Sequence, residues 1–218
     1  MVIENINIRY GENIILKPST LSVSSTGVTS LLGRNGTGKT SIMNSIYGLN
    51  DAKDIIISFD GVVMKRPYVN AGLLNYIGQK KCHPDFLTIN RVLNEYSITS
   101  SVFYNKYPIF MSDQWSRLDE LSYGFRRLFI ILVAIEADVR YTILDEPFSS
   151  IMPVHNELII SAIRSASDRK GLLISDHQFR TLLSVTDKLY LIFDQHVKLL
   201  NSHSELIDYG YLSKGTSL

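Results

Sequence analysis

The sequence has 218 residues, 45 % of them hydrophobic and 20 % charged, which is typical of a globular protein and excludes a disordered chain. Its 22 Lys and Arg residues nearly balance its 21 Asp and Glu residues, and the resulting net charge of +1 argues against nucleic acid as a partner. One cysteine, Cys82, excludes a disulfide within the chain, and the apolar stretch 128–137 is about half as long as the ~20 residues of a membrane-spanning helix. We therefore expect a soluble protein without a secretory signal, which reaches a membrane only by docking onto another protein.

The first third of the chain predicts short strands around a single helix. Strand patterns, which alternate apolar and polar residues or form short apolar runs, occupy positions 2–8, 21–24 and 28–32. Apolar spacing of three and four residues then predicts a helix over 40–47 that ends at Gly48. Two apolar runs, 55–59 and 62–63, flank Asp60-Gly61 and predict a hairpin with a type I′ turn.

The rest of the chain predicts a small helical insert followed by alternating helices and strands. A strand is predicted over 73–77, and the segment 80–120 has helical apolar spacing, many Tyr and Asn residues and few β-branched runs. Beyond it we expect, in chain order, a buried helix over 126–136, a strand over 141–144, a helix over 154–166, a strand over 171–175, a helix over 178–185 and a strand over 188–193. This alternation predicts an α/β protein with a mainly parallel sheet and helices packed on it.

A glycine-rich motif follows the strand predicted at 28–32. The eight residues from Gly33 to Thr40 read Gly-Arg-Asn-Gly-Thr-Gly-Lys-Thr and fit the pattern G-x-x-x-x-G-K-[ST] between a strand and a helix. Such a loop turns its backbone amides toward phosphates, and the N-terminus of the next helix adds partial positive charge. We expect Lys39 to reach the β- and γ-phosphates and Thr40 to place its hydroxyl on Mg²⁺. The loop predicts a nucleoside triphosphate site, against the alternative of a chance glycine-rich turn.

Two acids end the apolar strand at 141–144. The carboxyl ends of parallel strands meet at one edge of a sheet, and the glycine-rich loop begins at the same edge. Asp145 is therefore expected to hold Mg²⁺ through water, and Glu146 to point toward the γ-phosphate and polarise an attacking water. An acidic pair that caps a helix is the alternative interpretation, and the presence of the glycine-rich loop favours the catalytic one.

These two motifs, with four weaker ones in a fixed order, resemble the nucleotide-binding subunits of ATP-binding cassette (ABC) transporters over nearly the whole chain. Gln79 matches the glutamine that contacts Mg²⁺ and the attacking water and relays to the transmembrane partner. His177 matches the switch histidine at the γ-phosphate, Tyr10 matches the aromatic residue that stacks on adenine, and 121–127 matches the LSGGQ signature. Singly, each has a simpler interpretation: a polar strand end, a structural histidine or a surface tyrosine on an edge strand.

The resemblance implies a P-loop NTPase fold, with a mainly parallel sheet core and helices on it, an antiparallel β subdomain and a small helical subdomain. It divides the chain at 1–79 (antiparallel β subdomain and first part of the ATP-binding core), 80–121 (helical subdomain) and 122–218 (signature helix and second part of the core). The end of the chain, 188–212, resembles the strand, hairpin and short helix over 204–209 that close many such subunits.

In this family two copies face each other head to tail, and the signature of one closes on the γ-phosphate held by the other. Ser122 then offers a hydroxyl, and Gly124 lets a backbone amide approach at a helix N-terminus. The residues implied to bind the nucleotide are Tyr10, Gly33, Asn35, Gly36, Gly38, Lys39, Thr40, Ser41, Ser122 and Gly124. Those implied to act in hydrolysis are Lys39, Gln79, Glu146 and His177. Those implied to hold Mg²⁺ are Thr40, Gln79 and Asp145.

Three positions depart from the family's pattern. Tyr123 replaces the first glycine of the signature and Phe125 its glutamine, while Met152 stands where the family usually has an aspartate that couples the two sites. The helical segment is also short, and its aromatic stretch 103–110 is either a contact for a membrane partner or ordinary subdomain core. These departures leave the rate of turnover open.

The first hypothesis is the ATP-binding and ATP-hydrolysing subunit of an ABC transporter. ATP and Mg²⁺ would close it into a dimer with a second copy or a related chain, and it would sit on the cytoplasmic face of a membrane, bound to a transmembrane permease. The alternative is a soluble or degenerate ABC ATPase that acts as an ATP-dependent switch without transport. Members that act on DNA insert long coiled coils between the loop and the acids, and the span from Lys39 to Asp145 contains no heptads. The cargo and the direction of transport are not encoded in this subunit.

Overall fold

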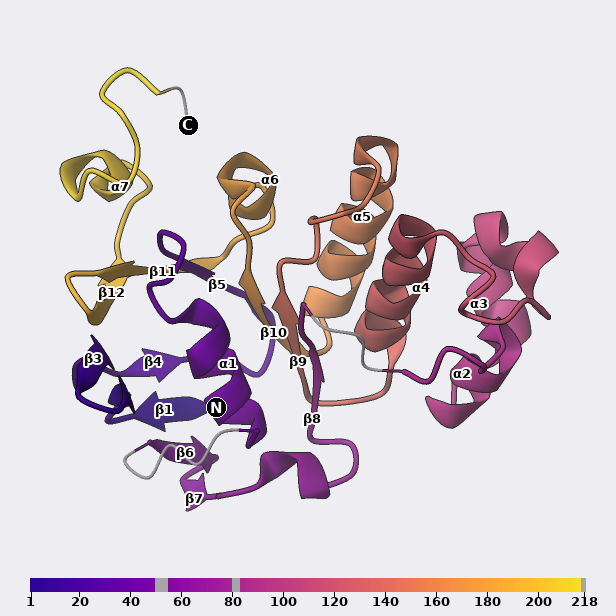
Figure 1. Cartoon of the computed structure of the whole chain (residues 1–218), viewed down its shortest axis with the longest axis horizontal. Helices are drawn as coiled ribbons and strands as arrows, with labels where there is room; N and C mark the ends of the chain where they lie inside the picture. Colours follow the sequence, from indigo (N-terminus) through magenta and orange to yellow (C-terminus); the bar gives the residue numbers. More distant parts are fainter. Residues whose placement is uncertain (50–54, 80–82, 217–218) are drawn as a thin grey trace.

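A sheet of six strands runs through the centre of the molecule, in the order β12, β11, β5, β10, β9, β8 (Figure 1). The computed structural model describes residues 1–49, 55–79 and 83–216, except for the side chain of Tyr10. The strands are β5 (Gly27–Leu32), β8 (Leu74–Ile77), β9 (Tyr141–Asp145), β10 (Gly171–Ser175), β11 (Lys188–Phe193) and β12 (His196–Leu200). Neighbouring strands are parallel except β12, which runs antiparallel to β11. The mainly parallel sheet that the sequence predicts is confirmed.

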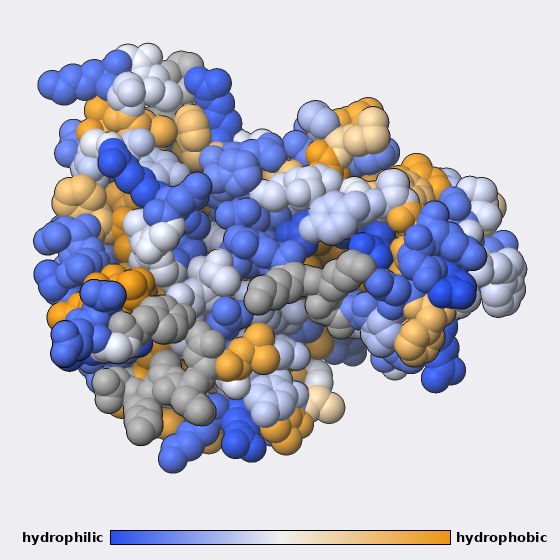
Figure 2. Space-filling model, viewed as in Figure 1, coloured by the Kyte–Doolittle hydropathy of each residue, from blue (hydrophilic) through white to orange (hydrophobic). Residues whose placement is uncertain are grey.

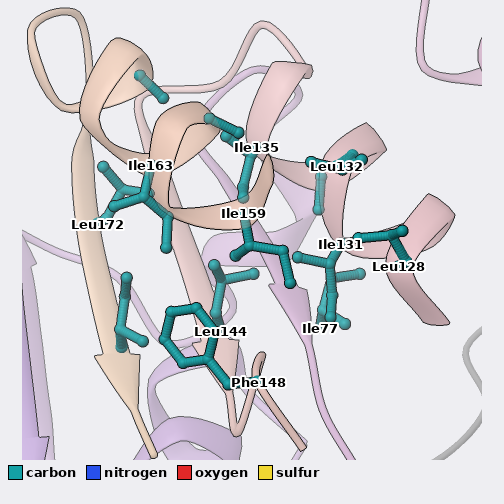
Figure 3. Packing of buried hydrophobic residues seen from close by; sticks show 14 of the residues in the cluster. Ile77, Leu128, Ile131, Leu132, Ile135, Leu144, Phe148, Ile159, Ile163 and Leu172 are labelled. Carbon is teal, nitrogen blue, oxygen red and sulfur yellow. The ribbon is translucent and has the colours of Figure 1, made fainter. Parts of the chain in front are cut away.

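Helices cover both faces of this sheet. Successive residues of a strand point to opposite sides, so each buried strand places apolar side chains on both faces. The helices that cover it are α1 (Lys39–Tyr47), α4 (Tyr123–Glu136), α5 (Asn156–Ser167) and α6 (Phe179–Leu183). Ile143 packs in the cluster that includes α1, whereas its neighbour Leu144 packs in the cluster that includes α4 and α5. Figure 3 shows that second cluster, in which Leu144 and Phe148 lie close to Ile159. Each such fully buried side chain contributes about 1.5–3 kcal/mol to folding.

A second sheet is antiparallel and packs on α1, on the side away from α4 and α5. Across the sheet its strands are β4 (Leu21–Ser22), β1 (Val2–Glu4), β6 (Ile56–Phe59) and β7 (Val62–Val63). The turn between β6 and β7 has φ angles of 51° at Asp60 and 79° at Gly61. Positive φ at both central residues is what a type I′ turn requires, so the predicted hairpin is confirmed.

The single strand predicted over 2–8 is wrong. β1 ends at Glu4 because Asn5 turns the chain with a left-handed φ of 51°, and β2 (Ile8–Tyr10) is a separate strand. β2 pairs antiparallel with β3 (Asn13–Leu16), which the sequence pattern does not predict. The residues of β3 before Leu16 are exposed or half-buried, so no alternation of apolar and polar residues marks this strand.

Short helices gather at the end of the molecule opposite β12 (Figure 1). They are α2 (Ile89–Glu95), α3 (Ser100–Lys106) and the 3-10 helix η2 (Pro108–Asp113). The rings of Phe103 and Phe110 lie 5.7 and 5.5 Å from the ring of Phe129 on α4, and both side chains are buried. The aromatic stretch 103–110 therefore supplies the core of this segment. Residues 80–82, where the predicted insert begins, lie outside the described residues.

Several helices begin or end at other residues than the pattern predicts. α4 begins at Tyr123 rather than at 126, because Oγ of Ser122 accepts a hydrogen bond from the amide of Phe125 (3.3 Å) and caps the helix. α5 begins two residues late, because the 3-10 turn η3 (Pro153–His155) precedes it. α6 is shorter than 178–185, and α7 (Glu205–Asp208) is shorter than 204–209. The remaining 3-10 turn is η1 (Pro67–Val69).

The helices can be compared with the length and apolar character of a membrane span. Among the helices that the described ranges contain, none has both the length and the apolar character needed to cross a bilayer. On the face shown in Figure 2, hydrophilic residues separate the apolar ones into small groups.

Candidate active site

The carboxyl ends of four parallel strands meet at one edge of the central sheet. β5 leads into Gly33, β8 is followed by Gln79, β9 ends at Asp145, and His177 lies two residues beyond β10. These strands are neighbours in the sheet, so residues far apart in the sequence come together at this edge.

The loop 33–38 curls around the end of the Lys39 side chain. Nζ of Lys39 donates to the carbonyl oxygens of Gly33 (2.7 Å) and Arg34 (3.2 Å). The loop turns through left-handed φ angles of 79° at Gly36 and 104° at Gly38, which glycine adopts without strain. This local conformation is the physical reason for the glycines that the sequence motif contains.

The side chain of Lys39 lies at this edge of the sheet and is almost completely shielded from solvent. Its relative exposure is 6 %, and burial lowers the pKa of its ammonium group, while the carboxylates of Glu146, Asp145 and Asp176 oppose that shift. A partly desolvated cation interacts more strongly with phosphate oxygens than an exposed one does.

Thr40, Asp145 and Ser175 form a short chain of hydrogen bonds beside Lys39. Oγ1 of Thr40 donates to Oδ2 of Asp145, and Oγ of Ser175 donates to Oδ1, each over 2.6 Å. A hydroxyl and a carboxylate side by side are the hard oxygen donors that suit Mg²⁺, which normally binds one or two carboxylates together with phosphate oxygens and water. In the part of the chain that the structure describes, no group of three or more His, Cys, Asp or Glu side chains is arranged to hold a metal by itself. The donors present therefore fit an ion that arrives with phosphates.

Glu146, Ser149 and His177 form a second polar group at the same edge. Oγ of Ser149 donates to Oε2 of Glu146 (3.2 Å) and lies 3.4 Å from Nδ1 of His177, which is itself 3.9 Å from Oε2 of Glu146. Glu146 has a left-handed φ of 55°, which is strained for a residue with a side chain. The strained backbone and the hydrogen bond together hold the carboxylate of Glu146 in one direction.

Asp176 is a buried carboxylate next to His177 that holds the backbone around this group. It is 1 % exposed, and its carboxylate accepts from the amides of Phe148 (2.9 Å) and Gln178 (2.8 Å). Burial raises the pKa of Asp176, and the two amide hydrogen bonds act against that shift. Asp176 therefore joins the loop after Glu146 to the loop that carries His177.

A cavity of about 400 Å³ opens between these groups, within the usual size of a small-ligand site. Its lining residues come from β3, the glycine-rich loop, α1 and the ends of β8 and β9: Ile15, Asn35, Gly36, Gly38, Lys39, Thr40, Ser41, Gln79 and Glu146. Most of the residues predicted to bind nucleotide and to act in hydrolysis thus share one cavity. Gly33 and Asp145 contact it through Lys39 and Thr40.

Ser122 and Gly124 lie outside this cavity, at the start of α4. Ser122 is exposed and caps the helix, and Gly124 packs so closely that a Cβ there would lie 2.8 Å from the carbonyl oxygen of Ser150. Only glycine fits such an approach. The chain therefore presents an exposed hydroxyl and a helix N-terminus away from its own phosphate loop.

The remaining residues are Tyr10 and the three that depart from the family's pattern, and they differ in how exposed they are. Tyr10 is on β2, and its side chain lies outside the described part. Phe125 is partly buried and packs against the core, with its ring 4.7 Å from that of Phe110, whereas Tyr123 and Met152 are 52 % and 65 % exposed. Tyr123 and Met152 therefore alter the exposed surface of the protein, whereas Phe125 alters the packing of the helical segment.

Sequence reasoning missed four residues of this edge. Ile15 lines the cavity from β3, which the sequence pattern does not predict, and no motif singles out Asp176 beside His177. Ser149 follows Glu146 by three residues in a loop, which is a usable signal for a side-chain contact. Arg127 of α4 donates to backbone oxygens near both Gln79 and Glu146, and no spacing rule in the sequence predicts that.

Comparisons with known proteins identify relatives of this chain. A family model described as ABC transporter matches residues 16–149. The lipopolysaccharide export system ATP-binding protein LptB of Escherichia coli (strain K12) is 26 % identical, over 94 % of this chain and 91 % of that protein. The ribose import ATP-binding protein RbsA of Lactococcus lactis subsp. lactis (strain IL1403) is 24 % identical, over 88 % of this chain and 42 % of that protein.

Solved structures share the fold. The structure of an ATP binding subunit of an ABC transporter superposes with a TM-score of 0.81 at 20 % identity, over 99 % of this chain and 95 % of that one. A nucleotide-free ATP-binding cassette from an ABC transporter gives a TM-score of 0.75 at 19 % identity, over 98 % and 95 % of the two chains. The architecture is therefore that of a P-loop NTPase cassette, as the sequence predicts.

Proposed function

The chain belongs to the ABC transporter family of ATP-binding proteins, and we propose that it binds and hydrolyses ATP with Mg²⁺ to drive a transporter. Members of this family hydrolyse ATP in general. The observation that carries the proposal is the 2.6 Å hydrogen bond between Thr40 and Asp145 beside the buried ammonium of Lys39. It joins the end of the phosphate loop to the acid-bearing strand at the mouth of the cavity.

The residues of this edge divide the work of hydrolysis between them. Lys39 stabilises negative charge on the β- and γ-phosphates, and the amides of the loop donate to the same oxygens. Bound Mg²⁺, held by Thr40, Asp145 and Gln79, would offset further charge on the phosphates. Glu146 accepts a proton from the attacking water, and His177 donates to the γ-phosphate.

A second protomer completes the site in this proposal. Ser122 is exposed at the N-terminus of the 14-residue helix α4, where the helix dipole favours an anion. It does not line the cavity of its own chain, which supports a head-to-tail dimer in which Ser122 and Gly124 reach the γ-phosphate of the partner copy. Two ATP molecules then lie between two copies, or between this chain and a related one.

We also propose a separate transmembrane permease as partner, with this chain on the cytoplasmic face of the membrane. LptB and RbsA are by name the ATP-binding proteins of a lipopolysaccharide export system and of ribose import. The two systems differ in the cargo and in the direction of transport. We therefore infer for this chain only the role of an ATP-binding subunit, and neither a cargo nor a direction. In this proposal the helical subdomain, 80–121, is inserted between the two parts of the ATP-binding core, 1–79 and 122–218.

A second candidate is an ATP-dependent switch with little turnover. The observation that favours it is Met152, 65 % exposed at the position where the resemblance expects an aspartate. The steady-state rate of ATP hydrolysis separates the two candidates: a switch binds ATP and closes, but it turns over slowly even with a membrane partner present.

The deciding experiment compares the parent with Glu146→Gln. We expect the variant to bind ATP as tightly as the parent and to lose about 10²–10⁴-fold in kcat, because it lacks the general base. Glu157→Gln, an exposed carboxylate on α5, is the matched control and keeps the parent rate. Hydrolysis by Glu146→Gln at the parent rate would refute the role of Glu146, and absence of ATP binding by the parent would refute the proposed function.

A further inference from the structure

Arg127 forms several hydrogen bonds to the backbone of the segments that carry this site. Its guanidinium donates to four backbone carbonyl oxygens: Nε to Ser149 (3.2 Å), Nη1 to Gly78 (3.2 Å), and Nη2 to Asp145 (3.1 Å) and Glu146 (2.9 Å). A planar group with five N–H donors can bridge several acceptors at fixed angles, and a lysine ammonium cannot do so in the same plane.

Three of the acceptors lie at the ends of two neighbouring strands, and the fourth, Ser149, lies in the loop that follows β9. Ile77 pairs with Leu144 at the last position of the ladder between β8 and β9. Gly78 and Asp145 come immediately after that pair, where the ladder ends and the two segments separate. Arg127 lies at this point and hydrogen-bonds to both segments, so its side chain continues the connection that the ladder no longer provides.

Three of the four acceptors belong to, or lie next to, a residue of the proposed hydrolytic site. Gly78 precedes Gln79, and Glu146 itself offers a carbonyl oxygen. The amide of Glu146 donates to Ser175 (2.7 Å), so both peptide groups of this left-handed residue are held by hydrogen bonds. Arg127 therefore contacts the backbone next to Gln79 and at Glu146 itself.

Arg127 also joins this pair to the start of α4. It follows Gly124 by three residues, so the two positions lie on one face of the helix. Gly124 packs against the carbonyl oxygen of Ser150, and Arg127 donates to that of Ser149. The first turns of α4 and the loop after Glu146 consequently form one packed unit.

We propose that Arg127 is a positioning residue that sets the spacing of Gln79 and Glu146 and couples it to the N-terminus of α4. The inference rests on the proposed hydrolysis of ATP and deepens it. Arg127 does not line the cavity, so it acts through the backbone of its neighbours rather than on the nucleotide.

Two substitutions, Arg127→Lys and Arg127→Gln, test the proposal in the full chain. We expect kcat to fall roughly tenfold in Arg127→Lys and roughly a hundredfold in Arg127→Gln, since a misplacement of about 1 Å costs about that much. The dissociation constant for ATP, measured without Mg²⁺ so that no hydrolysis occurs, should stay within about twofold of the parent value. A merely structural role would move affinity, kcat and melting temperature together.

The matched controls are Arg164→Lys and Arg164→Gln on α5. Arg164 is exposed, and its guanidinium donates to a single carbonyl oxygen, that of Ser184 (3.3 Å). These variants should keep the parent kcat and affinity. If Arg127→Gln fails to fold, Arg127→Lys decides the question, because it keeps the charge and most of the side-chain volume.

Amide hydrogen exchange gives a readout that does not need turnover. Arg127→Lys should speed exchange in the peptide 145–150 and leave the peptide 171–175 unchanged. An unchanged kcat in Arg127→Lys, or unchanged exchange in 145–150, overturns the proposal. A parent protein that binds ATP but does not hydrolyse it counts against the proposed function instead, and the exchange experiment still decides the role of Arg127.

Discussion

The two ends of strand β9 each bury a charged group, and they do so in different surroundings. At the carboxyl end, Asp145 is fully buried and accepts hydrogen bonds from Thr40 and Ser175, next to the open cavity. At the amino end, Lys170 is 1 % exposed and donates to the carbonyl oxygen of Ala137 (2.5 Å) and to Oγ1 of Thr142 (3.2 Å). Both charged groups are hydrogen-bonded, and the first lies beside the cavity described above.

Under the proposed function, this difference separates a buried charge that acts in catalysis from one that stabilises the fold. Ala137 is the C-cap residue of α4, so Lys170 satisfies a helix end that would otherwise lack a donor. Burial lowers the pKa of Lys170 to about 7, with Arg169 adding to that shift and Glu136 and Asp138 opposing it. We therefore expect changes at Asp145 to affect activity, and changes at Lys170 to affect stability.

Among changes that compare the two ends of β9, Asp145→Asn has the largest expected effect. The amide still accepts one hydroxyl hydrogen bond but lacks the charge that holds Mg²⁺, so kcat should fall by about 10²–10³-fold. Steady-state ATPase assays at saturating Mg²⁺ and thermal melting of the same samples measure the two properties. A variant that unfolds below room temperature would break the distinction between the two ends of β9.

The next effect concerns the pH dependence of stability. Lys170 has a pKa of about 7 in the folded chain and the ordinary 10.5 in the unfolded chain. Between these values the unfolded state binds more protons, so the free energy of unfolding contributed by Lys170 rises with pH and levels off below pH 7. From pH 7 to about 9.5 the rise is on the order of 3 kcal/mol, at about 1.4 kcal/mol per pH unit.

Lys170→Met isolates this contribution from other titrating groups. Urea unfolding of the parent and the variant at the two pH values should show the rise in the parent and most of it missing in the variant. The variant should keep the parent kcat at pH 7 within about twofold, because Lys170 is remote from the cavity. Equal slopes in the two proteins would mean that Lys170 is not neutral in the folded chain above pH 7.

The smallest effect is that of Ser149→Ala, at the carboxyl end again. Removing the hydroxyl deletes the 3.2 Å hydrogen bond to Glu146, and a bond of this kind contributes about 1 kcal/mol, or roughly fivefold in kcat. Ser167→Ala on α5, which loses a hydrogen bond to the carbonyl oxygen of Arg164, is a suitable control with unchanged kcat. A loss above a hundredfold would show that Ser149 takes part in the chemistry directly.

The sequence predicts the carboxyl end of β9 much better than the amino end. The phosphate loop and the pair of acids depend on local spacing, and parallel topology brings their strands to the same edge. In contrast, Asp168-Arg169-Lys170-Gly171 has the composition of a solvated turn. Only the packing of α4 against the sheet buries Lys170, and local patterns do not contain that information.

The same reason explains the other differences between prediction and structure. β3 is mostly exposed and is defined by its pairing with β2, so its pattern carries no periodic signal. Phe125 was compared with a motif, but its ring is fixed by Phe110 of the helical segment. Arg127 takes its acceptors from two segments that are far apart in the sequence, one at Gly78 and one over 145–149, so its role becomes visible only once those segments are placed side by side.

The hydrogen bonds of Asp145 also bear on which cation this edge prefers. Both carboxylate oxygens already accept a hydroxyl proton, one from Thr40 and one from Ser175, so the group offers few direct lone pairs to an ion. A small ion that retains several of its own waters can bind through those waters and the oxygen of Thr40. Calcium, which gathers roughly six to eight oxygens with little geometric preference, finds too few here. In the proposed site, a preference for magnesium over calcium would therefore depend on the hydroxyl groups of Thr40 and Ser175 as well as on the carboxylate.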